Sequence, residues 1–278
     1  MSNYEEDYNN YCNKVVNEGV WVHNERTGKR CLTMINHDFV YDVGAGDVAL
    51  LTNKQCFTVS AAAEVIGYYR KYTNAHDFAR IGSPTWFGNS NNESWLNNPH
   101  RKGDGDVGSI YGAVTGVSLY EIYTKLKCGV DDRGLIYQMW RPDTFDKGCL
   151  RPCAYEHIWS LLDGNLSLTV TQRSGDMALG IPFNSFSFCF LLKLMAKITG
   201  HKPDKVYHKV INNHIYEDQI EPLELQLSRT PMDITPALEI ADWVTCLDDV
   251  LKDDIHAREY FTLTGYEHQG KISFPFSA

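Results

Sequence analysis

The segment 184–200, NSFSFCFLLKLMAKITG, constrains the fold more than any other part of the sequence. Its pattern predicts a helix that is apolar on nearly all sides and that ends at Gly200, with Pro203 shortly after. A helix without a polar face has to be covered by other elements, so we expect it at the centre of the molecule. The chain has 278 residues, which is enough to build a sizeable core around such a helix.

The remaining segments predict a mixture of strands and helices. Strands are expected over 134–140, 165–172 and 205–211, helices over 61–72 and 235–254, and a long loop rich in Gly, Asn, Ser and Pro over 82–108. Because strands and helices do not alternate in a regular βαβ rhythm, the sequence predicts an α+β fold. No linker divides the chain, so we expect one domain over 21–278, preceded by a polar N-terminal extension over 1–20.

Charge and cysteine usage exclude several classes of protein. The formal net charge of −9 argues against a broad basic face for polymeric nucleic acid, although a few arginines could still hold a small anion. The N-terminus is polar and acidic, and no apolar run approaches the ~18 residues of a membrane span, so no membrane is expected. Eight scattered cysteines without metal-binding spacing favour a reducing cytoplasm and no metal site.

A cluster of polar side chains follows directly on the strand expected at 165–172. The stretch 171–184, TQRSGDMALGIPFN, contains Gln172, Arg173, Ser174, Asp176, Gly180 and Asn184. Arg173 and Ser174 could hold a phosphate, and the amide of Asn184 could recognise the edge of a nucleobase. On the residues alone, however, an ordinary strand-to-helix turn with Asn184 as helix cap is favoured.

Cys153 lies four residues after Cys149 in the stretch GCLRPCAYEHIW, 148–159. It could be a metal ligand, half of a disulfide, a buried filler or a nucleophile. Most single cysteines in a cytosolic protein fill the core, and the residues around Cys153 do not decide the question by themselves.

Three stretches in order resemble the thymidylate synthase family, which includes the phage pyrimidine-nucleotide hydroxymethylases. They are RPCAYEH, LTVTQRSGDMALGIPFNSFSF and NNHIYEDQIEPLELQLSRTP. The resemblance covers roughly 21–278, with an atypical stretch at 87–107. It implies that 21–278 form a catalytic domain in which a mixed sheet packs against helices and the sheet face forms a homodimer interface. It also implies a pyrimidine deoxynucleoside monophosphate as substrate and 5,10-methylenetetrahydrofolate as one-carbon donor.

The same resemblance places the nucleophile of the family at Cys153. A thiolate that adds to C6 of the pyrimidine makes C5 reactive toward a one-carbon electrophile, and the positive charge of Arg173 could favour the thiolate. The resemblance also implies that Arg173, Ser174 and Arg26 bind the 5′-phosphate. Arg133 would reach the phosphate of the neighbouring subunit, which implies an obligate homodimer.

Further roles come from the resemblance alone. Gln172 and Asn184 belong to the substrate-binding set, with Asn184 at the base edge, and His214 and Tyr216 contact the sugar hydroxyl. Glu64 relays protons through water toward O4 of the pyrimidine, and Tyr111 assists proton removal from C5. Trp86, Asp176 and Gly180 line the folate region, and Asp176 also belongs to the catalytic set. Singly, Glu64 could be a solvated helix residue, and Trp86 and Tyr111 could be core aromatics.

Three departures from the synthase pattern bear on the product. Ala154 stands where synthases carry histidine, Arg133-Gly134 where they carry Arg-Arg, and Arg141 follows tryptophan where they carry asparagine. These features resemble the phage hydroxymethylases, and Asn184 suits uracil better than cytosine. We therefore expect a dUMP hydroxymethylase, located in the host cytoplasm if the source is a virus. The alternatives are a thymidylate synthase, a dCMP hydroxymethylase, or a catalytically silent homologue that binds nucleotide or RNA.

Overall fold

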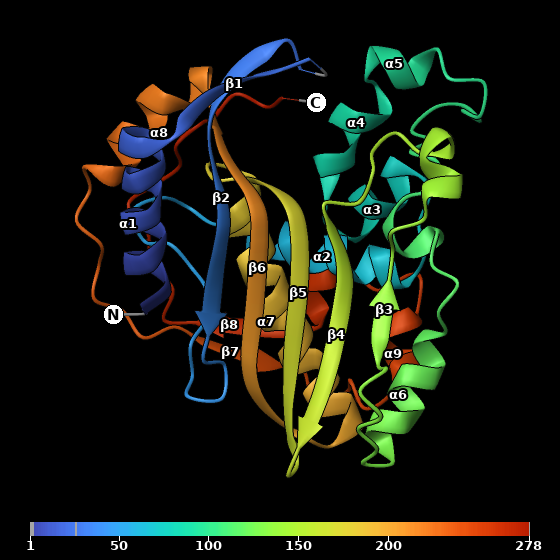
Figure 1. The fold of residues 1–278 in the computed structure, drawn as a ribbon. Helices are drawn as coiled ribbons and strands as arrows, with labels where there is room; N and C mark the ends of the chain where they lie inside the picture. Colours follow the sequence, from blue (N-terminus) through green and yellow to red (C-terminus); the bar gives the residue numbers. More distant parts are fainter. Residues whose placement is uncertain (1–2, 26, 278) are drawn as a thin grey trace.

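The computed structural model describes residues 3–25 and 27–277, and its centre is a six-stranded mixed sheet in the order β1-β2-β6-β5-β4-β3 (Figure 1). The strands are β1 (Val20–Asn24), β2 (Lys29–Tyr41), β3 (Ile136–Gln138), β4 (Ala154–Leu162), β5 (Asn165–Asp176) and β6 (Lys202–Tyr216). Only the central pair, β5 and β6, runs parallel, while the other neighbours in this sheet are antiparallel. The expected α+β fold is confirmed.

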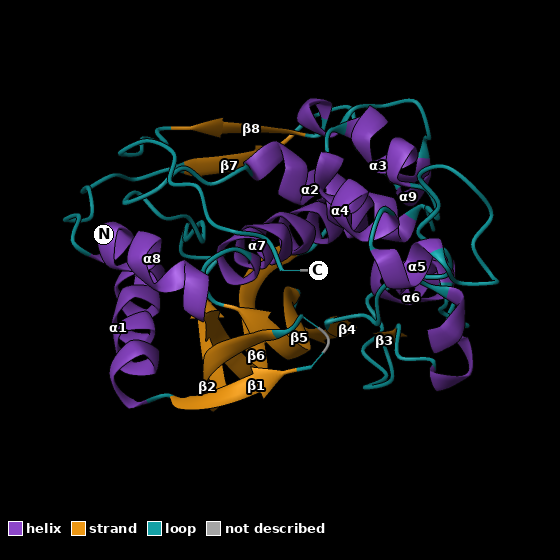
Figure 2. Cartoon of the chain, turned by 90° about the horizontal axis from the view of Figure 1, so that it is seen from above, coloured by secondary structure: helices purple, strands orange, loops and turns teal. Residues whose placement is uncertain are grey.

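The apolar helix lies at the centre, as its sequence predicts. It forms α7 (Gly180–Thr199), which crosses one face of the sheet from β5 to β6 and ends at Gly200 with a φ of 82°. Helix α2 (Thr58–Tyr69) packs against α7 on the same face (Figure 2). Among the described residues, α7 is the one helix long and apolar enough to cross a membrane. However, 78% of its most apolar window is buried inside the molecule, as in a core helix.

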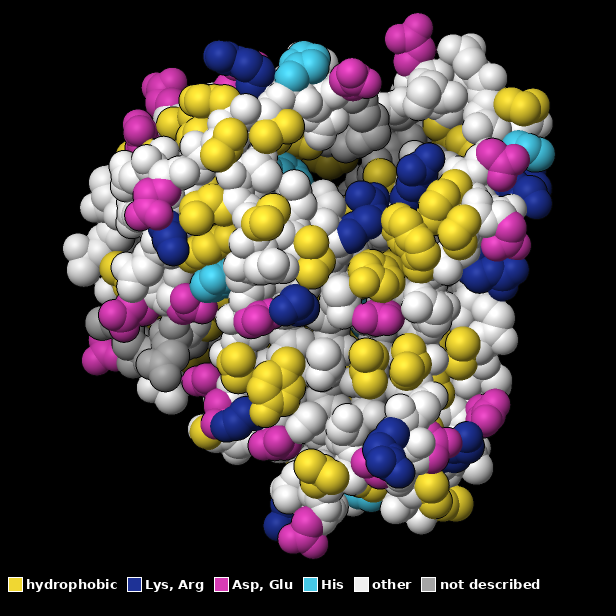
Figure 3. Space-filling model, viewed as in Figure 1, with side chains coloured by type: hydrophobic (Ala, Val, Ile, Leu, Met, Phe, Trp, Pro, Cys, Tyr) yellow, Lys and Arg dark blue, Asp and Glu magenta, His cyan; other side chains and the backbone are white. Residues whose placement is uncertain are grey.

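The other face of the sheet carries exposed apolar side chains (Figure 3), and the views in Figures 1 and 2 show no helix laid across it. Val40 and Tyr207 are directly paired across β2 and β6, and they are 47% and 43% exposed. Ile35 on β2 and Leu162 at the end of β4 are each 70% exposed. Apolar side chains along neighbouring strands are typical of a face that another protein surface covers.

The N-terminal segment forms α1 (Asn3–Glu18), which packs beside β2. Its buried side chains include Tyr8, Cys12 and Val15, and the Tyr8 hydroxyl donates to the carbonyl of Met177 at 2.7 Å. The division of the chain into 1–20 and 21–278 stays a prediction about folding units.

The long loop expected at 82–108 contains short helices instead. They are η1 (Pro84–Trp86), α4 (Phe87–Ser90) and α5 (Glu93–Leu96). Trp95 is 2% exposed, and its indole N–H donates to the carbonyl of Asp106 at 2.6 Å. The Asn92 side chain caps α5 by accepting the N–H of Ser94. Composition alone suggested a loop because asparagine is common both in turns and at helix caps, and Asn92 acts here as a cap.

The single helix predicted over 235–254 is wrong. The segment forms a strand, β7 (Ala237–Ile240), and then a short helix, α9 (Leu247–Leu251). Side chains alternate in β7, with Leu238 and Ile240 buried, and β7 pairs with β8 (Phe261–Thr264). Asp249 accepts the backbone N–H groups of Thr245 and Cys246, which starts a new helix there. The remaining elements are α3 (Ala75–Ile81), η2 (Tyr111–Ala113), α6 (Leu119–Lys127), η3 (Pro142–Lys147), η4 (Glu217–Gln219), α8 (Ile220–Leu227) and η5 (Ala257–Glu259).

Candidate active site

A cleft of about 1030 Å³ brings most of the predicted site residues together. It lies where the C-terminal ends of β5 and β6 meet the start of β4, α2 and the C-terminal tail. Figure 3 shows a hollow above the sheet with Lys and Arg side chains at its rim. The predicted residues that line the cleft are Glu64, Trp86, Tyr111, Cys153, Gln172, Arg173, Ser174, Asp176, Gly180, Asn184, His214 and Tyr216. Arg133 does not line the cleft of its own chain, and Arg26 lies outside the described residues.

Cys153 lies immediately before β4, next to Arg173 of β5. The backbone N–H of Arg173 donates to the Cys153 carbonyl at 2.8 Å, so the two strands hold these residues side by side. The Arg173 guanidinium donates to the carbonyls of Pro152 and Arg151, each at 3.0 Å, and its Nη2 lies 3.9 Å from Cys153 Sγ. A positive charge held this close to a sulfur favours the thiolate over the thiol.

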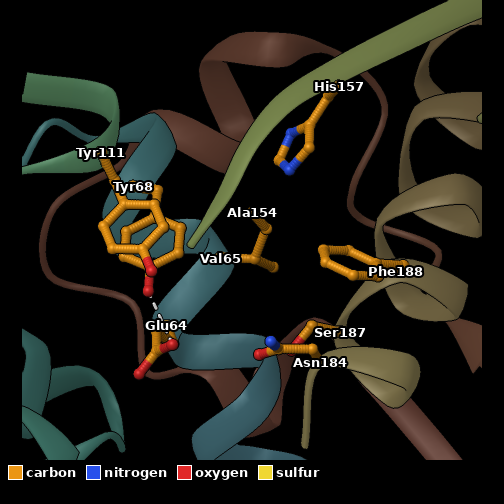
Figure 4. A pocket seen from close by; sticks show the side chains of 9 residues that line it. All are labelled: Glu64, Val65, Tyr68, Tyr111, Ala154, His157, Asn184, Ser187 and Phe188. Atoms are coloured by element: carbon orange, nitrogen blue, oxygen red, sulfur yellow. Dashed lines mark hydrogen bonds between the residues drawn. The ribbon is translucent and has the colours of Figure 1, made fainter. Parts of the chain in front are cut away.

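Tyr111, Tyr68 and Glu64 form a connected group (Figure 4), and Tyr111 contacts Cys153. The Tyr111 hydroxyl accepts the backbone N–H of Cys153 at 3.1 Å, and its ring stacks on Tyr68 at 4.0 Å. The Tyr68 hydroxyl donates to Glu64 at 2.6 Å, and the Thr85 hydroxyl donates to the other carboxylate oxygen at 2.9 Å. Burial raises the pKa of Glu64 and raises that of Tyr111 well above its usual value. A carboxyl group with a raised pKa is suited to proton transfer near neutral pH.

Asn184 lies inside α7 rather than at its cap, because the helix already begins at Gly180. Its amide N–H donates to Gln172 Oε1 at 3.0 Å, and Gln172 donates in turn to the Ser174 carbonyl at 2.9 Å. Asp176 makes the turn into the helix by accepting the N–H groups of Ala178 and Leu179, at 2.9 and 3.0 Å. The amide of Asn184 is therefore oriented by β5.

His214 and Tyr216 alternate on β6 and point to the same side of the strand, as an H-x-Y pair predicts. Their rings meet edge to face at 5.2 Å, and His214 Nδ1 lies 3.0 Å from Asn212 Oδ1. Both side chains line the cleft.

Several residues of the cleft were not predicted from the sequence. Lys54 is buried, its ammonium donates to the Ala178 carbonyl, and burial lowers its pKa. Arg151 at the mouth lies over the ring of Phe145 at 4.7 Å. The tail contributes Phe274 and Phe276. The signals available in the sequence were a lysine three residues after the apolar run that ends at Leu51, and an arginine two residues before Cys153.

A second, smaller cavity of about 20 Å³ lies beneath the cleft, between α2, β4 and α7. Figure 4 shows His157 at one end, Glu64 and Asn184 at the other, and Ala154 between them. Burial lowers the pKa of His157 to about 3, so its ring is neutral, and Nδ1 lies 3.2 Å from the Tyr69 hydroxyl. A polar cavity of this size holds about one water molecule.

The cleft has the parts of an enzyme that uses a cysteine thiolate as its nucleophile: a thiol beside a guanidinium, a buried carboxylic acid and an oriented amide. The sequence model of the family described as "Thymidylate synthase" matches residues 6–278. The thymidylate synthase of Aliivibrio fischeri is 47% identical over 287 residues, which cover 97% of this chain and 99% of the relative. Those of Shewanella loihica and Glaesserella parasuis are 47% and 45% identical, over 96% and 97% of this chain and 97% and 99% of theirs. The chain belongs to the thymidylate synthase family.

Family membership confirms some of the expectations and overturns others. A one-carbon transferase that acts on a pyrimidine deoxynucleoside monophosphate and uses 5,10-methylenetetrahydrofolate is confirmed. Hydroxymethylation of dUMP as the main activity is wrong, because relatives at 45–47% identity over nearly the whole chain are thymidylate synthases. The silent homologue is overturned by the same finding, and nothing in the comparisons supports the relationship to phage hydroxymethylases.

The departures at Ala154 and Gly134 therefore do not indicate hydroxymethylation. Ala154 is 7% exposed and lines the small cavity, which has room for about one water molecule beside its methyl group. The C-terminal tail borders the cleft: Phe276 lies beside Gly88, and the Pro275 carbonyl accepts from Gln219 at 3.2 Å.

Proposed function

We propose that this protein converts dUMP to dTMP, with 5,10-methylenetetrahydrofolate as the one-carbon donor. The observation that carries the proposal is the position of Cys153 Sγ, 3.9 Å from the Arg173 guanidinium. The sulfur lies in a cleft that it shares with the oriented amide of Asn184 and the buried carboxyl group of Glu64.

The nucleotide binds, in this proposal, with its phosphate against Arg173 and Ser174, helped by Arg26. The sugar hydroxyl faces His214 and Tyr216, whose side chains share one side of β6. This orientation brings the base toward Asn184. With one amide hydrogen held by Gln172, Asn184 still offers an oxygen for N3–H and a second hydrogen for O4 of uracil, so dUMP fits better than dCMP.

The chemistry begins when the Cys153 thiolate adds to C6 of the pyrimidine. Electron density then moves to C5 and O4, and the developing charge on O4 needs a proton or a strong hydrogen bond. Glu64 supplies it through water, because burial raises the pKa of this carboxyl group and keeps a proton available. The Tyr111 hydroxyl, neutral because its pKa is raised, lies beside the cysteine to assist when C5 loses its hydrogen.

The cleft also fits a folate beside the nucleotide. Its volume of about 1030 Å³ lies at the upper end of the range for small-molecule pockets, which leaves room for a second ligand. Trp86 is 3% exposed, and its indole N–H is buried with no partner among the described residues. Trp86, Phe183 and Phe274 offer flat apolar surface for an aromatic ring, and Asp176 and Gly180 lie beside it. When bound, the folate supplies the one-carbon unit and the reducing hydride.

The protein acts as a homodimer in this proposal, and the exposed apolar face of the sheet is the contact surface. Val40 and Tyr207 would be covered there by a second copy of the same face. Arg133 is exposed in the loop before β3, with a φ of 56°, and would complete the phosphate site of the partner. The activity is proposed to be cytoplasmic.

The test compares two cysteine variants in a turnover assay that follows dihydrofolate by absorbance. Cys153→Ser is expected to lower kcat by at least about 10⁴-fold while it still binds dUMP, since an alcohol is a far weaker nucleophile than a thiolate. Cys128→Ser changes an exposed cysteine at the end of α6 and should keep wild-type turnover. A Cys153→Ser protein that still turns over dUMP would refute the proposed nucleophile.

A further inference from the structure

A chain of buried hydrogen bonds continues behind Gln172, away from the cleft. Gln172 Oε1, which accepts from Asn184, also lies 2.8 Å from His208 Nε2. His208 Nδ1 lies 2.8 Å from the Tyr41 hydroxyl, which in turn lies 2.8 Å from Ser185 Oγ. Tyr41, His208 and Ser185 have no exposed surface, and Gln172 is 1% exposed. The chain joins β2, β6, β5 and α7 through side chains that water does not reach.

The direction of these hydrogen bonds follows from the chemistry of each group. Burial lowers the pKa of His208 to about 3, so its ring carries one proton at neutral pH. Gln172 uses its NH₂ group on the Ser174 carbonyl, which leaves its oxygen to face His208 and Asn184. That oxygen can only accept, so His208 Nε2 carries the proton and donates it. His208 Nδ1 is then a bare acceptor, and the Tyr41 hydroxyl donates to it.

Two donors thus converge on one oxygen, and this arrangement decides which way the Asn184 amide faces. A flipped Asn184 would set its own oxygen against Gln172 Oε1, with no proton between them. The orientation that remains offers an acceptor to N3–H of uracil and a donor to O4. Cytosine requires the opposite pattern, because its N3 accepts and its amino group donates.

We propose that His208 is a positioning residue that holds the Asn184 amide in the orientation that recognises uracil and rejects cytosine, with Tyr41 fixing its tautomer. The inference rests on the proposed function, because it assigns the base edge to Asn184. His208 acts through Gln172 and does not line the cleft. Its removal is therefore expected to change the preference between nucleotides more than the chemical step.

The experiment measures dissociation constants of dUMP and dCMP by calorimetry for the full-length protein and its variants. His208→Leu is expected to narrow the ratio of the two constants by about fivefold to tenfold, the effect of losing one hydrogen bond between neutral groups. His208→Gln can place an N–H where Nε2 stood and is expected to keep most of the wild-type ratio. Tyr260→Phe removes another buried tyrosine hydroxyl, which donates to the Asp249 carbonyl outside the cleft, and should keep the ratio unchanged.

Each outcome bears on the inference. A folded His208→Leu protein with the wild-type ratio overturns it, and so does a His208→Gln protein that behaves like His208→Leu. If His208→Leu does not fold, Tyr41→Phe carries the test: loss of the donor to Nδ1 should narrow the ratio by a smaller factor, and an unchanged ratio overturns the inference. If the wild type forms dTMP but the ratio of the dUMP and dCMP dissociation constants stays constant in the variants, only the positioning role of His208 is refuted. A wild type that binds neither nucleotide refutes the proposed function and the positioning role of His208 together.

Discussion

Gly112 permits the closest backbone approach near the candidate nucleophile, and Gly112→Ala is the sharpest structural test of the site. The residue follows Tyr111 in η2, where the chain passes directly over α2. An added Cβ would overlap the carbonyl oxygen of Tyr68 and lie 2.7 Å from its carbonyl carbon. Both are backbone atoms near the end of α2, so neither can move aside as a flexible side chain would. We expect η2 to shift instead, and Tyr111 with it.

The size of the effect has two parts. Overpacking of a tightly packed site costs about 1–3 kcal/mol, and a domain somewhat smaller than this one loses roughly 2–4 °C in Tm for each kcal/mol. The shift also strains the contact between the Tyr111 hydroxyl and the backbone N–H of Cys153, now 3.1 Å. A displacement of about 1 Å at a catalytic group can lower turnover by roughly 10²-fold.

The assay combines thermal unfolding with the dihydrofolate turnover measurement. Gly116→Ala is the matched control, because an added Cβ there would meet only Arg141 Nη1, at 3.4 Å, within 4 Å. The control should unfold and turn over nearly as the wild type does. A Gly112→Ala protein with the Tm and kcat of Gly116→Ala would refute the close approach and the role given to Tyr111.

Three further predictions concern charge, assembly and packing. Burial raises the folded-state pKa of Glu64, so its stability contribution is present below the unfolded pKa and is lost as pH rises through the folded pKa. The Tm of Glu64→Gln, relative to that of the wild type, should therefore rise as the pH increases above about 4, the unfolded pKa of a glutamate, while kcat falls by about 10²–10⁴-fold. A Tm difference that does not depend on pH would contradict this. Mixing the Arg133→Ala protein with the Cys153→Ala protein should restore up to about a quarter of wild-type activity. After subunit exchange about half of the dimers are mixed, and one of the two sites in each mixed dimer has both an intact Cys153 and an intact Arg133 from the partner. No recovery of activity would exclude a site shared between subunits. Ala154→His should lower the free energy of unfolding by about 1–3 kcal/mol, because the adjoining cavity of about 20 Å³ cannot hold an imidazole. Ala154→Ser should change the free energy of unfolding by under ~0.5 kcal/mol. Equal stabilities of these two variants would contradict a cavity of this size.

The parts of the site that lie close together in the chain were predictable. The cluster from Gln172 to Asn184 follows one strand into one helix, so its residues had to meet at the end of β5. The apolar helix was predictable for a related reason, since a helix without a polar face has to be buried. His214 and Tyr216 share a side of β6 because of the two-residue period of a strand.

Residues that reach the site only through tertiary contacts were not predictable. Tyr68 joins the site because Tyr111, more than forty positions later in the chain, stacks on its ring. Lys54 joins the site because it donates to the Ala178 carbonyl just before α7. His208 lies within β6 and meets Gln172 only because β6 pairs with β5. The wrong helix at 235–254 has a similar cause, because β7 exists through its pairing with β8. The expected product was wrong because it was inferred from single absent side chains such as the histidine replaced by Ala154.

The identity of the nucleotide product tests the central claim most directly. The protein is incubated with dUMP and 5,10-methylenetetrahydrofolate, the nucleotide is identified by mass spectrometry and dihydrofolate is measured by absorbance. The proposed function predicts dTMP and dihydrofolate in equal amounts, abolished by Cys153→Ser. Formation of 5-hydroxymethyl-dUMP without dihydrofolate, or no change in dUMP at all, would contradict it.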